Sequence, residues 1–230
     1  MCNKQDYIDK LIEKRLFSEF FALECKTEKN EDKRFNLTVI LIKEISQQSN
    51  SIINEIYEPI IGKYLYEGLT QNNPKHIQNT IFSISNLVLS SAKICDHIYS
   101  TGVTEQLEKL LFFETYDNLQ ADILLCLNNF LQNRVQSVCR HMIINCNLYI
   151  KIAKFLTSQN KIVIYNTLAL YEDIIEITEE LSQSYDNPVI SYMYKESIVE
   201  VIGFLGKSSD KDIAEKAQAI VDIYFGTLDP

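Results

Sequence analysis

One polar residue recurs inside apolar, helix-like segments at a nearly constant interval. Asn86 lies in SISNLV, and Asn129 lies 43 residues later in CLNNFL. Glu44 precedes Asn86 by 42 residues, and Asp173 follows Asn129 by 44. An interval of this length is typical of repeat proteins, in which each unit packs on the next. The interval therefore constrains the fold more than any other feature of the chain.

The residues within one interval form three helix-like segments in the order short, medium and long. Residues 92–102 (AKICDHIYSTG) predict a short helix ending near Gly102, because glycine commonly ends a helix. Residues 103–114 predict a second helix, and 119–133 (LQADILLCLNNFLQN) predict the long one, with apolar residues every three or four positions. Three helices in about 42 residues is the armadillo-repeat pattern.

We therefore expect an all-α fold, a right-handed superhelical solenoid of about five armadillo repeats. No unit of this kind can bury its apolar faces alone, so neighbouring units share one core. Only six glycines and four prolines occur, which disfavours an all-β fold rich in tight turns. The chain is expected to form a single domain over residues 1–230, with a partial first repeat at 5–48 and repeats at about 50–91, 92–133, 135–185 and 188–226.

Composition narrows the classes of partner. The net charge of −9 repels a phosphate backbone, so no nucleic-acid partner is expected, whereas a basic peptide is attracted. No run of 18 apolar residues predicts a membrane span, and the first 16 residues are too charged for a secretory signal. We expect the protein in the cytoplasm, the nucleus or both. The six cysteines form no CxxC pair and are expected to be unpaired thiols.

The sequence carries no motif of a known catalytic site. GxxxxGK[ST], GxGxxG, GxSxG and HExxH are all missing, and the three histidines lie in separate helical segments. Cys139, His141 and Cys146 are spaced unlike common zinc ligands. We therefore expect a non-enzymatic protein with no cofactor and no metal.

The recurring amides have two explanations. In an armadillo solenoid the third helices line a groove, and an amide offers two donors and an acceptor that can hold the backbone of an extended peptide. Alternatively, each amide bonds a neighbouring repeat and stabilises the stack, since buried amides are usually satisfied by the protein itself. The residues alone leave both explanations open.

Several segments resemble importin-α (karyopherin-α). TIFSISNLVLSS is similar to the third helix of an importin-α repeat, and the resemblance continues through KICDHIYSTGVTEQLEKLL. The C-terminal segment YKESIVEVIGFLGKSSDKDIAEKAQAIVDIYFG resembles the final repeat of that family, and its closing EKAQAIVDIYFG is the most specific part. The resemblance covers about residues 35–226. It implies an adaptor that binds nuclear-localisation-signal-like segments, basic or extended, for nuclear protein import.

In that family each third helix presents a tryptophan and an asparagine four residues apart, with acidic residues nearby for the lysines of the signal. The asparagine positions correspond here to Asn86 and Asn129, with Asp173 and Glu44 one repeat on either side. The chain has no tryptophan; Ile40, Phe82, Leu125 and Ala169 stand at those positions, so cation–π contacts are reduced. The resemblance thus implies a peptide-binding groove lined by Phe82, Asn86, Asp122, Leu125, Asn129 and Asp173.

The chain also departs from that family in its length. It has room for about five repeats, and MCNKQDYIDKLIEKR lacks the basic cluster of an importin-β-binding arm. The resemblance implies that the C-terminal repeats engage a nuclear export receptor. The alternative is an armadillo scaffold subunit that docks a fixed protein partner and has lost signal binding. A third hypothesis is assembly through the N-terminal end, where Phe17, Phe20 and Phe21 lie close together.

Overall fold

The computed structural model describes residues 39–113, 119–181 and 187–226, and every regular element in these ranges is a helix. The chain divides into two compact units, Met1–Lys109 and Leu110–Pro230. Within the described ranges, no helix has the length and hydrophobicity needed to cross a membrane. The partial first repeat and the phenylalanine cluster near the N-terminus lie largely or wholly outside the described residues.

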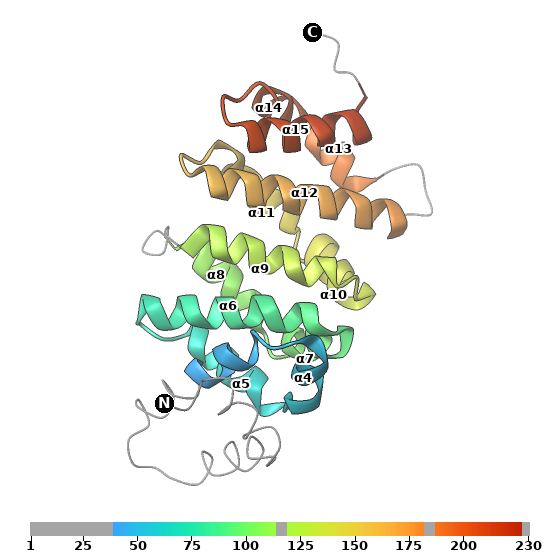
Figure 1. Ribbon diagram of the computed structural model, residues 1–230. Helices are drawn as coiled ribbons and strands as arrows, with labels where there is room; N and C mark the ends of the chain where they lie inside the picture. The colour runs from blue at the N-terminus through green and yellow to red at the C-terminus, as the bar shows by residue number, and fades with distance from the viewer. Residues whose placement is uncertain (1–38, 114–118, 182–186, 227–230) are drawn as a thin grey trace. The chain divides into compact units, whose positions relative to one another are not determined.

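The first unit is built around one long helix. Figure 1 shows α6 as the longest helix of this unit, and it contacts α4, α5 and α7. Its apolar face, which includes Ile77, Ile81 and Ile84, is fully buried. The helices are residues 39–45, α4 (Asn50–Ile56), α5 (Ile60–Leu69), α6 (Pro74–Ser90), α7 (Ala92–Ser100) and α8 (Val103–Leu111), whose last two residues belong to the second unit.

The start of α6 follows from two adjacent residues. The side chain of Asn73 accepts a hydrogen bond from the Lys75 amide over 3.0 Å, and Pro74 occupies the first turn. Asparagine satisfies an amide that would otherwise lack a helical partner, and proline has no N–H to lose at this position. Further along α6, Thr80 packs so closely against α5 that a Cβ at Gly68 would lie 2.5 Å from its Oγ1.

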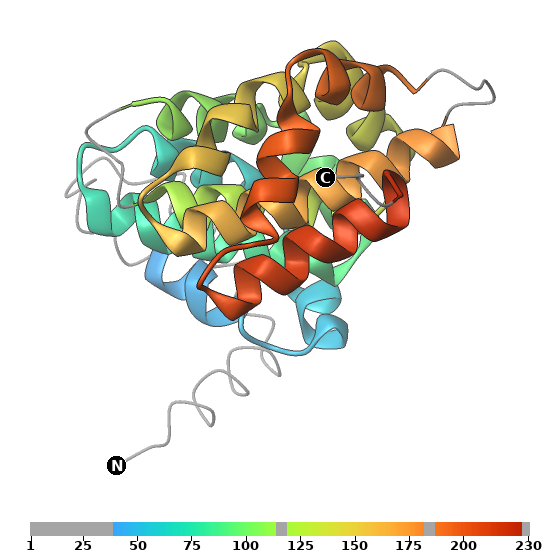
Figure 2. The ribbon, with the colours of Figure 1, turned by 90° about the horizontal axis from the view of Figure 1, so that it is seen from above.

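The second unit repeats the order of two shorter helical stretches followed by one long helix. In Figure 1 the long helices α9, α12 and α15 form one layer, and the shorter helices lie behind them. Seen from above, α15 in red runs alongside α12 in orange (Figure 2). The elements are α9 (Gln120–Gln132), α10 (Gln136–Arg140), the π-helix η2 (His141–Asn145), α11 (Leu148–Ile152), the 3₁₀-helix η3 (Ala153–Thr157), α12 (Lys161–Leu181), α13 (Pro188–Lys195), α14 (Ile198–Leu205) and α15 (Lys211–Tyr224).

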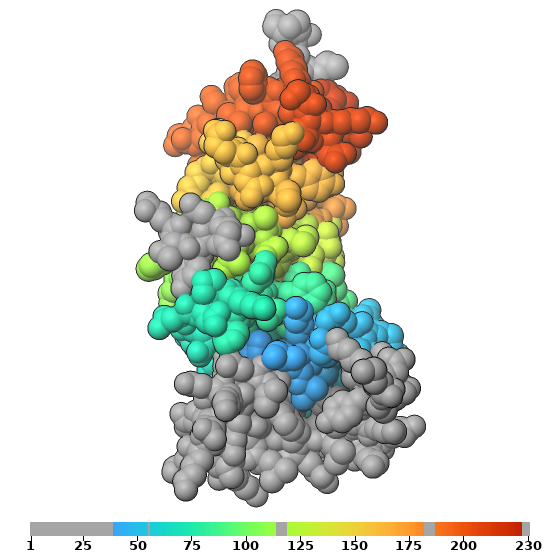
Figure 3. Space-filling view, turned by 60° about the vertical axis from the view of Figure 1, so that its left-hand side comes forward, coloured from blue at the N-terminus to red at the C-terminus, as the bar shows by residue number. Residues whose placement is uncertain are grey.

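The core of the second unit lies between the long and the short helices. Figure 3 shows the gold segment around the start of α12 and the orange and red helices after it as one closely packed surface. Tyr171 of α12 is fully buried, and its hydroxyl donates to the Tyr149 carbonyl of α11 over 2.6 Å. A buried hydroxyl needs such an acceptor, so this bond fixes α12 against α11.

In three repeats, the turn between the first and the second helix contains one residue in the same backbone conformation. Gly102 precedes α8, Asn147 precedes α11, and Ser197 precedes α14, with φ values of 81°, 52° and 55°. All three lie in the left-handed region, which costs little for glycine but strains other residues. The predicted helix end at Gly102 is confirmed, and the packing of the flanking helices imposes the same turn on Asn147 and Ser197.

Candidate functional site

The two apolar side chains predicted for the groove stand at matching places on α6 and α9. Phe82 is 44% exposed and Leu125 is 45% exposed, although their neighbours on both helices are buried. Ile40, 42 residues before Phe82, is 50% exposed. Large apolar side chains therefore face solvent at three successive positions of the series. Ala169, the next position of the series, is partly buried.

The two predicted asparagines differ in burial. Asn86 is half-buried, and its Nδ2 lies 3.5 Å from Ser46 Oγ in the preceding helical segment. Asn129 is only 7% exposed, whereas Asp122 on the same helix is partly exposed. The contact of Asn86 is of the kind that stabilises neighbouring repeats. Ligand binding by Asn86, Asn129 and Asp122 remains a prediction.

Phe82 already has a cation from its own chain. Lys43 Nζ lies 5.4 Å from the centroid of the Phe82 ring and 2.8 Å from Asn79 Oδ1. A distance below about 6 Å places an ammonium group within the range of cation–π attraction. Lys43 thus makes with Phe82 the cation–π contact that the sequence predicted for the lysine of a ligand, and its ammonium group also bonds to Asn79.

Asp173 also pairs with a cation from the neighbouring repeat. Arg134, in the turn between α9 and α10, places a guanidinium nitrogen 2.5 Å from Glu176 Oε2 and 3.6 Å from Asp173 Oδ1. Burial alone would lower the pKa of Arg134, but the bond to Glu176 and the charges of Glu176, Asp173 and Glu180 raise it. The guanidinium therefore stays charged and bridges two carboxylates of α12.

The C-terminal half of α12 carries five carboxylates on one side. We call this surface the acidic face of α12; it consists of Glu172, Asp173, Glu176, Glu179 and Glu180. Lys216 of α15 forms an ion pair with Glu172, and Arg134 bridges Asp173 and Glu176. These two cations pair with three of the five carboxylates, so the face keeps an excess of negative charge.

The pKa values of nearby groups reflect this arrangement. Burial raises the pKa of the Asp173 carboxyl, while the charge of Arg134 and a hydrogen bond from Gln132 oppose that rise. Burial also raises the pKa of Tyr224 on α15, and the charges of Glu176 and other carboxylates of the acidic face raise it further. The carboxylates of α12 therefore influence a side chain of the next long helix.

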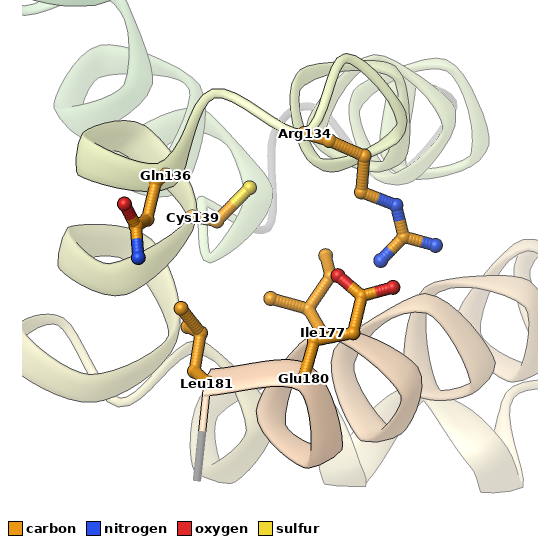
Figure 4. A pocket seen from close by; sticks show the side chains of 6 residues that line it. All are labelled: Arg134, Gln136, Cys139, Ile177, Glu180 and Leu181. Atoms are coloured by element: carbon orange, nitrogen blue, oxygen red, sulfur yellow. The ribbon is translucent and has the colours of Figure 1, made fainter. Parts of the chain in front are cut away.

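A pocket of about 250 Å³ lies beside the acidic face. Figure 4 shows Arg134 and Glu180 on one side with their charged groups facing each other, while Gln136 and Cys139 from α10 stand opposite. Ile177 and Leu181 of α12 complete the wall. Burial raises the pKa of Cys139 to about 11, so this thiol is protonated at neutral pH and is no nucleophile.

A second polar row lies about two turns before the first, and only its middle member, Asp122, was among the predicted groove residues. Asn79, Asp122 and Asn166 recur at intervals of 43 and 44 residues. Asn79 accepts from Lys43, and Asn166 Nδ2 donates to the Ala121 carbonyl of α9 over 2.8 Å. The same repeat interval that revealed Asn86 and Asn129 would have revealed these positions.

The described part of the chain contains no group of three side chains suited to hold a metal ion. Cys139 is buried against the Leu131 carbonyl, whereas Cys146 Sγ lies 3.6 Å from His141 Nδ1 across η2. These residues therefore do not converge on one point. The chemistry available at the open faces of α6, α9 and α12 is hydrogen bonding, ion pairing and apolar contact.

No protein-family model and no curated protein sequence matches the chain. Among solved structures, the chain is similar to a designed armadillo repeat protein in complex with the peptide (KR)4. The TM-score is 0.71 at 17% sequence identity, and the match covers 94% of this chain and 84% of that one.

Two further structures agree with this result. Computationally designed armadillo repeat proteins for modular peptide recognition match with a TM-score of 0.58 at 14% identity, covering 83% of this chain and 93% of that one. Another designed armadillo repeat protein matches at 0.56 and 14% identity, covering 90% and 98%. The chain thus has the all-α armadillo-repeat fold that the 43-residue interval predicted.

Proposed function

We propose that this chain is a non-enzymatic adaptor that binds basic, extended peptide segments along the open faces of its long helices. The observation that carries the proposal is the charge of the acidic face of α12, where two internal cations pair with only three of five carboxylates. A peptide rich in lysine and arginine complements this charge. The fold supports the proposal, because a similar designed protein forms a complex with the peptide (KR)4.

A finer proposal follows from the sequence resemblance to importin-α. Under it the bound segment is nuclear-localisation-signal-like, the adaptor serves nuclear protein import from the cytoplasm, and the C-terminal repeats engage a nuclear export receptor. The segment EKAQAIVDIYFG and the spacing of Asn86 and Asn129 support it. Phe82 and Leu125 would contact the aliphatic stems of the ligand's lysines, with weaker cation attraction than tryptophan provides.

A second candidate is a scaffold that docks one fixed protein partner and no longer binds signals. The internal cations favour this alternative, because Lys43 contacts Phe82 and Arg134 pairs with Asp173. Both groove positions thereby carry part of the interaction that a ligand's cation would otherwise make. A scaffold would use its open faces for a partner of defined shape rather than for an extended basic segment.

A titration with fluorescein-labelled (KR)4 peptide separates the two candidates. The adaptor predicts saturable binding in the micromolar range that weakens steeply with salt, as expected for an interaction between opposite charges. A peptide of equal length with every lysine and arginine replaced by glutamine is the control. Absence of binding at about 100 μM, where even weak peptide complexes form, would exclude the adaptor and favour the scaffold.

Variants then identify the surface that binds. Glu176→Gln and Glu179→Gln should each weaken binding of the labelled peptide, because each removes a charge from the acidic face. Asp96→Asn removes an exposed carboxylate from α7 and is the control for net charge. Asn86→Ala combined with Asn129→Ala tests the predicted amide contacts, with thermal unfolding measured in parallel because Asn129 is buried.

A further inference from the structure

We propose that Arg134 is an internal competitor that limits the affinity of the acidic face for basic peptides. This inference rests on the proposed peptide-binding function and concerns its regulation. The guanidinium of Arg134 contacts both Glu176 and Asp173, which are central carboxylates of the face. An arginine or lysine of a ligand that binds both of these carboxylates must compete with Arg134 for them.

The backbone of the chain holds Arg134 in its position. Arg134 follows the last turn of α9 with a φ of 55°, and its amide donates to the Leu131 carbonyl over 2.9 Å. A left-handed conformation is unfavourable for arginine, so the surrounding structure determines it. The side chain therefore starts from a fixed point and reaches α12, which belongs to the next repeat.

The side chain of Arg134 itself is able to move away. It is about one-third exposed, and Glu176 is about half exposed, so water can replace either partner. Ion pairs with this exposure are weak and are readily exchanged. By contrast, Lys216 and Glu172 are both mostly buried, and this second ion pair is the more permanent one.

A third carboxylate, that of Glu180, can pair with Arg134 after a ligand has displaced it. In Figure 4 the guanidinium faces Glu180 across the mouth of the pocket, beside Ile177. Glu180 already contributes to the electrostatic environment of Arg134. A ligand guanidinium would occupy Asp173 and Glu176 while Arg134 turns toward Glu180, and no charge would be left buried without a counter-ion.

The alternative is that Arg134 serves only to stabilise the contact between α9 and α12. In that case its removal would lower stability and would leave peptide affinity unchanged or reduced. Under the competitor hypothesis, Arg134→Gln exposes the carboxylate pair and increases local negative charge. We expect Arg134→Gln to bind the (KR)4 peptide about 3- to 10-fold more tightly, as the loss of one competing exposed ion pair predicts.

Lys211→Gln is the matched control. Lys211 lies at the start of α15, is exposed, and pairs with Glu215 within the same helix over 3.4 Å. Its removal changes the net charge by the same amount but leaves the acidic face of α12 unaltered. Lys211→Gln should therefore change the affinity much less than Arg134→Gln. Equal tightening in both variants would contradict the competitor role.

Glu176→Gln completes the experiment. In this background the effect of Arg134→Gln on peptide affinity should largely disappear, since the carboxylate for which the two cations compete is gone.

In the wild-type protein, the Nε–Hε NMR signal of Arg134 should shift as the peptide binds. This measurement tests displacement even if a variant fails to fold.

The outcomes separate the inference from the proposed function. Binding by the wild type without tightening in Arg134→Gln, or without a shift of the Arg134 signal, overturns the inference and leaves the peptide-binding function in place. If neither the wild type nor Arg134→Gln binds the peptide, the peptide-binding function fails and the competitor role fails with it.

Discussion

Asn166 of α12 donates a hydrogen bond from its side-chain amide to the Ala121 carbonyl of α9 over 2.8 Å. Two long helices of neighbouring repeats are thus joined by an amide that is half-buried in a largely apolar helix. The recurring polar residue at this position therefore stabilises the stack of repeats, because its side-chain amide forms a hydrogen bond within the protein.

Asn166→Ala should destabilise the second unit by about 1 kcal/mol, the typical contribution of one hydrogen bond. Urea unfolding followed by circular dichroism measures the change. Asn72→Ala, at an exposed asparagine before α6, is the control and should have little effect. A variant at position 166 as stable as the wild type would show that the bond to Ala121 contributes nothing.

Gly68→Ala should destabilise the first unit although alanine is the better helix former. The added methyl group would lie 2.5 Å from Thr80 Oγ1 and 2.9 Å from its Cγ2, so α5 and α6 would have to move apart. Such overpacking costs about 1–3 kcal/mol. Thr80→Ala in the same chain should recover part of the loss, and additive effects in a double-mutant cycle would argue against this clash.

Ser197→Gly and Gly102→Ala should change stability in opposite directions. Ser197 has a φ of 55°, where glycine is less strained, and Gly102 has a φ of 81°, where alanine is more strained. We expect a gain of a few tenths of a kcal/mol for Ser197→Gly and a loss of about 1 kcal/mol for Gly102→Ala. Thermal unfolding of the two variants tests the sign of each change.

Asp210 should make stability depend on pH in acid. A hydrogen bond from Lys161 and one from the Ile213 amide at the start of α15 lower its pKa below the ordinary 3.8. A carboxyl whose pKa is lower in the folded chain stabilises it above the unfolded value. That contribution disappears as the pH falls through the folded pKa. Asp210→Asn should therefore be less stable than the wild type at pH 7, and the difference should shrink as the pH falls below the ordinary pKa of 3.8. Urea unfolding at a series of pH values measures the difference.

Cys139 should resist alkylation in the folded protein. Burial raises its pKa to about 11, so at pH 8 only about one molecule in a thousand carries the reactive thiolate. Cys146 is partly exposed and should react with iodoacetamide first. Peptide mass spectrometry distinguishes the two sites. Equal rates in native protein would mean that the pocket beside α10 opens to solvent.

The sequence contained enough information for the repeat and for most helix ends. The 43-residue interval predicted the armadillo fold, and the helix end predicted near Gly102 is confirmed. An Asn–Pro pair such as Asn187–Pro188 is compatible with either a turn or the start of a helix. It starts α13, because Asn187 accepts from the Val189 and Ile190 amides.

Other features of the structure could not be predicted from any local sequence pattern. The π-helix η2 lies in a segment whose apolar periodicity is that of an ordinary helix, and this periodicity does not distinguish the two hydrogen-bond registers. The pairing of Arg134 with Asp173 joins residues from two repeats, and no short motif records it. Only the 42-residue separation of Arg134 and Glu176, equal to the repeat interval, pointed to that contact.

The cations that contact the long helices α6 and α12 come from other helical segments or turns. Lys43 lies before α4 and meets Phe82 on α6; Arg134 follows α9 and meets α12; Lys216 belongs to α15 and also meets α12. The net charge on the surface of one long helix therefore depends on the sequence of the neighbouring repeat. The repeats of this chain are consequently not interchangeable. A repeat moved into another armadillo protein would prefer different ligands, because residues of its new neighbours would alter the charge that it displays.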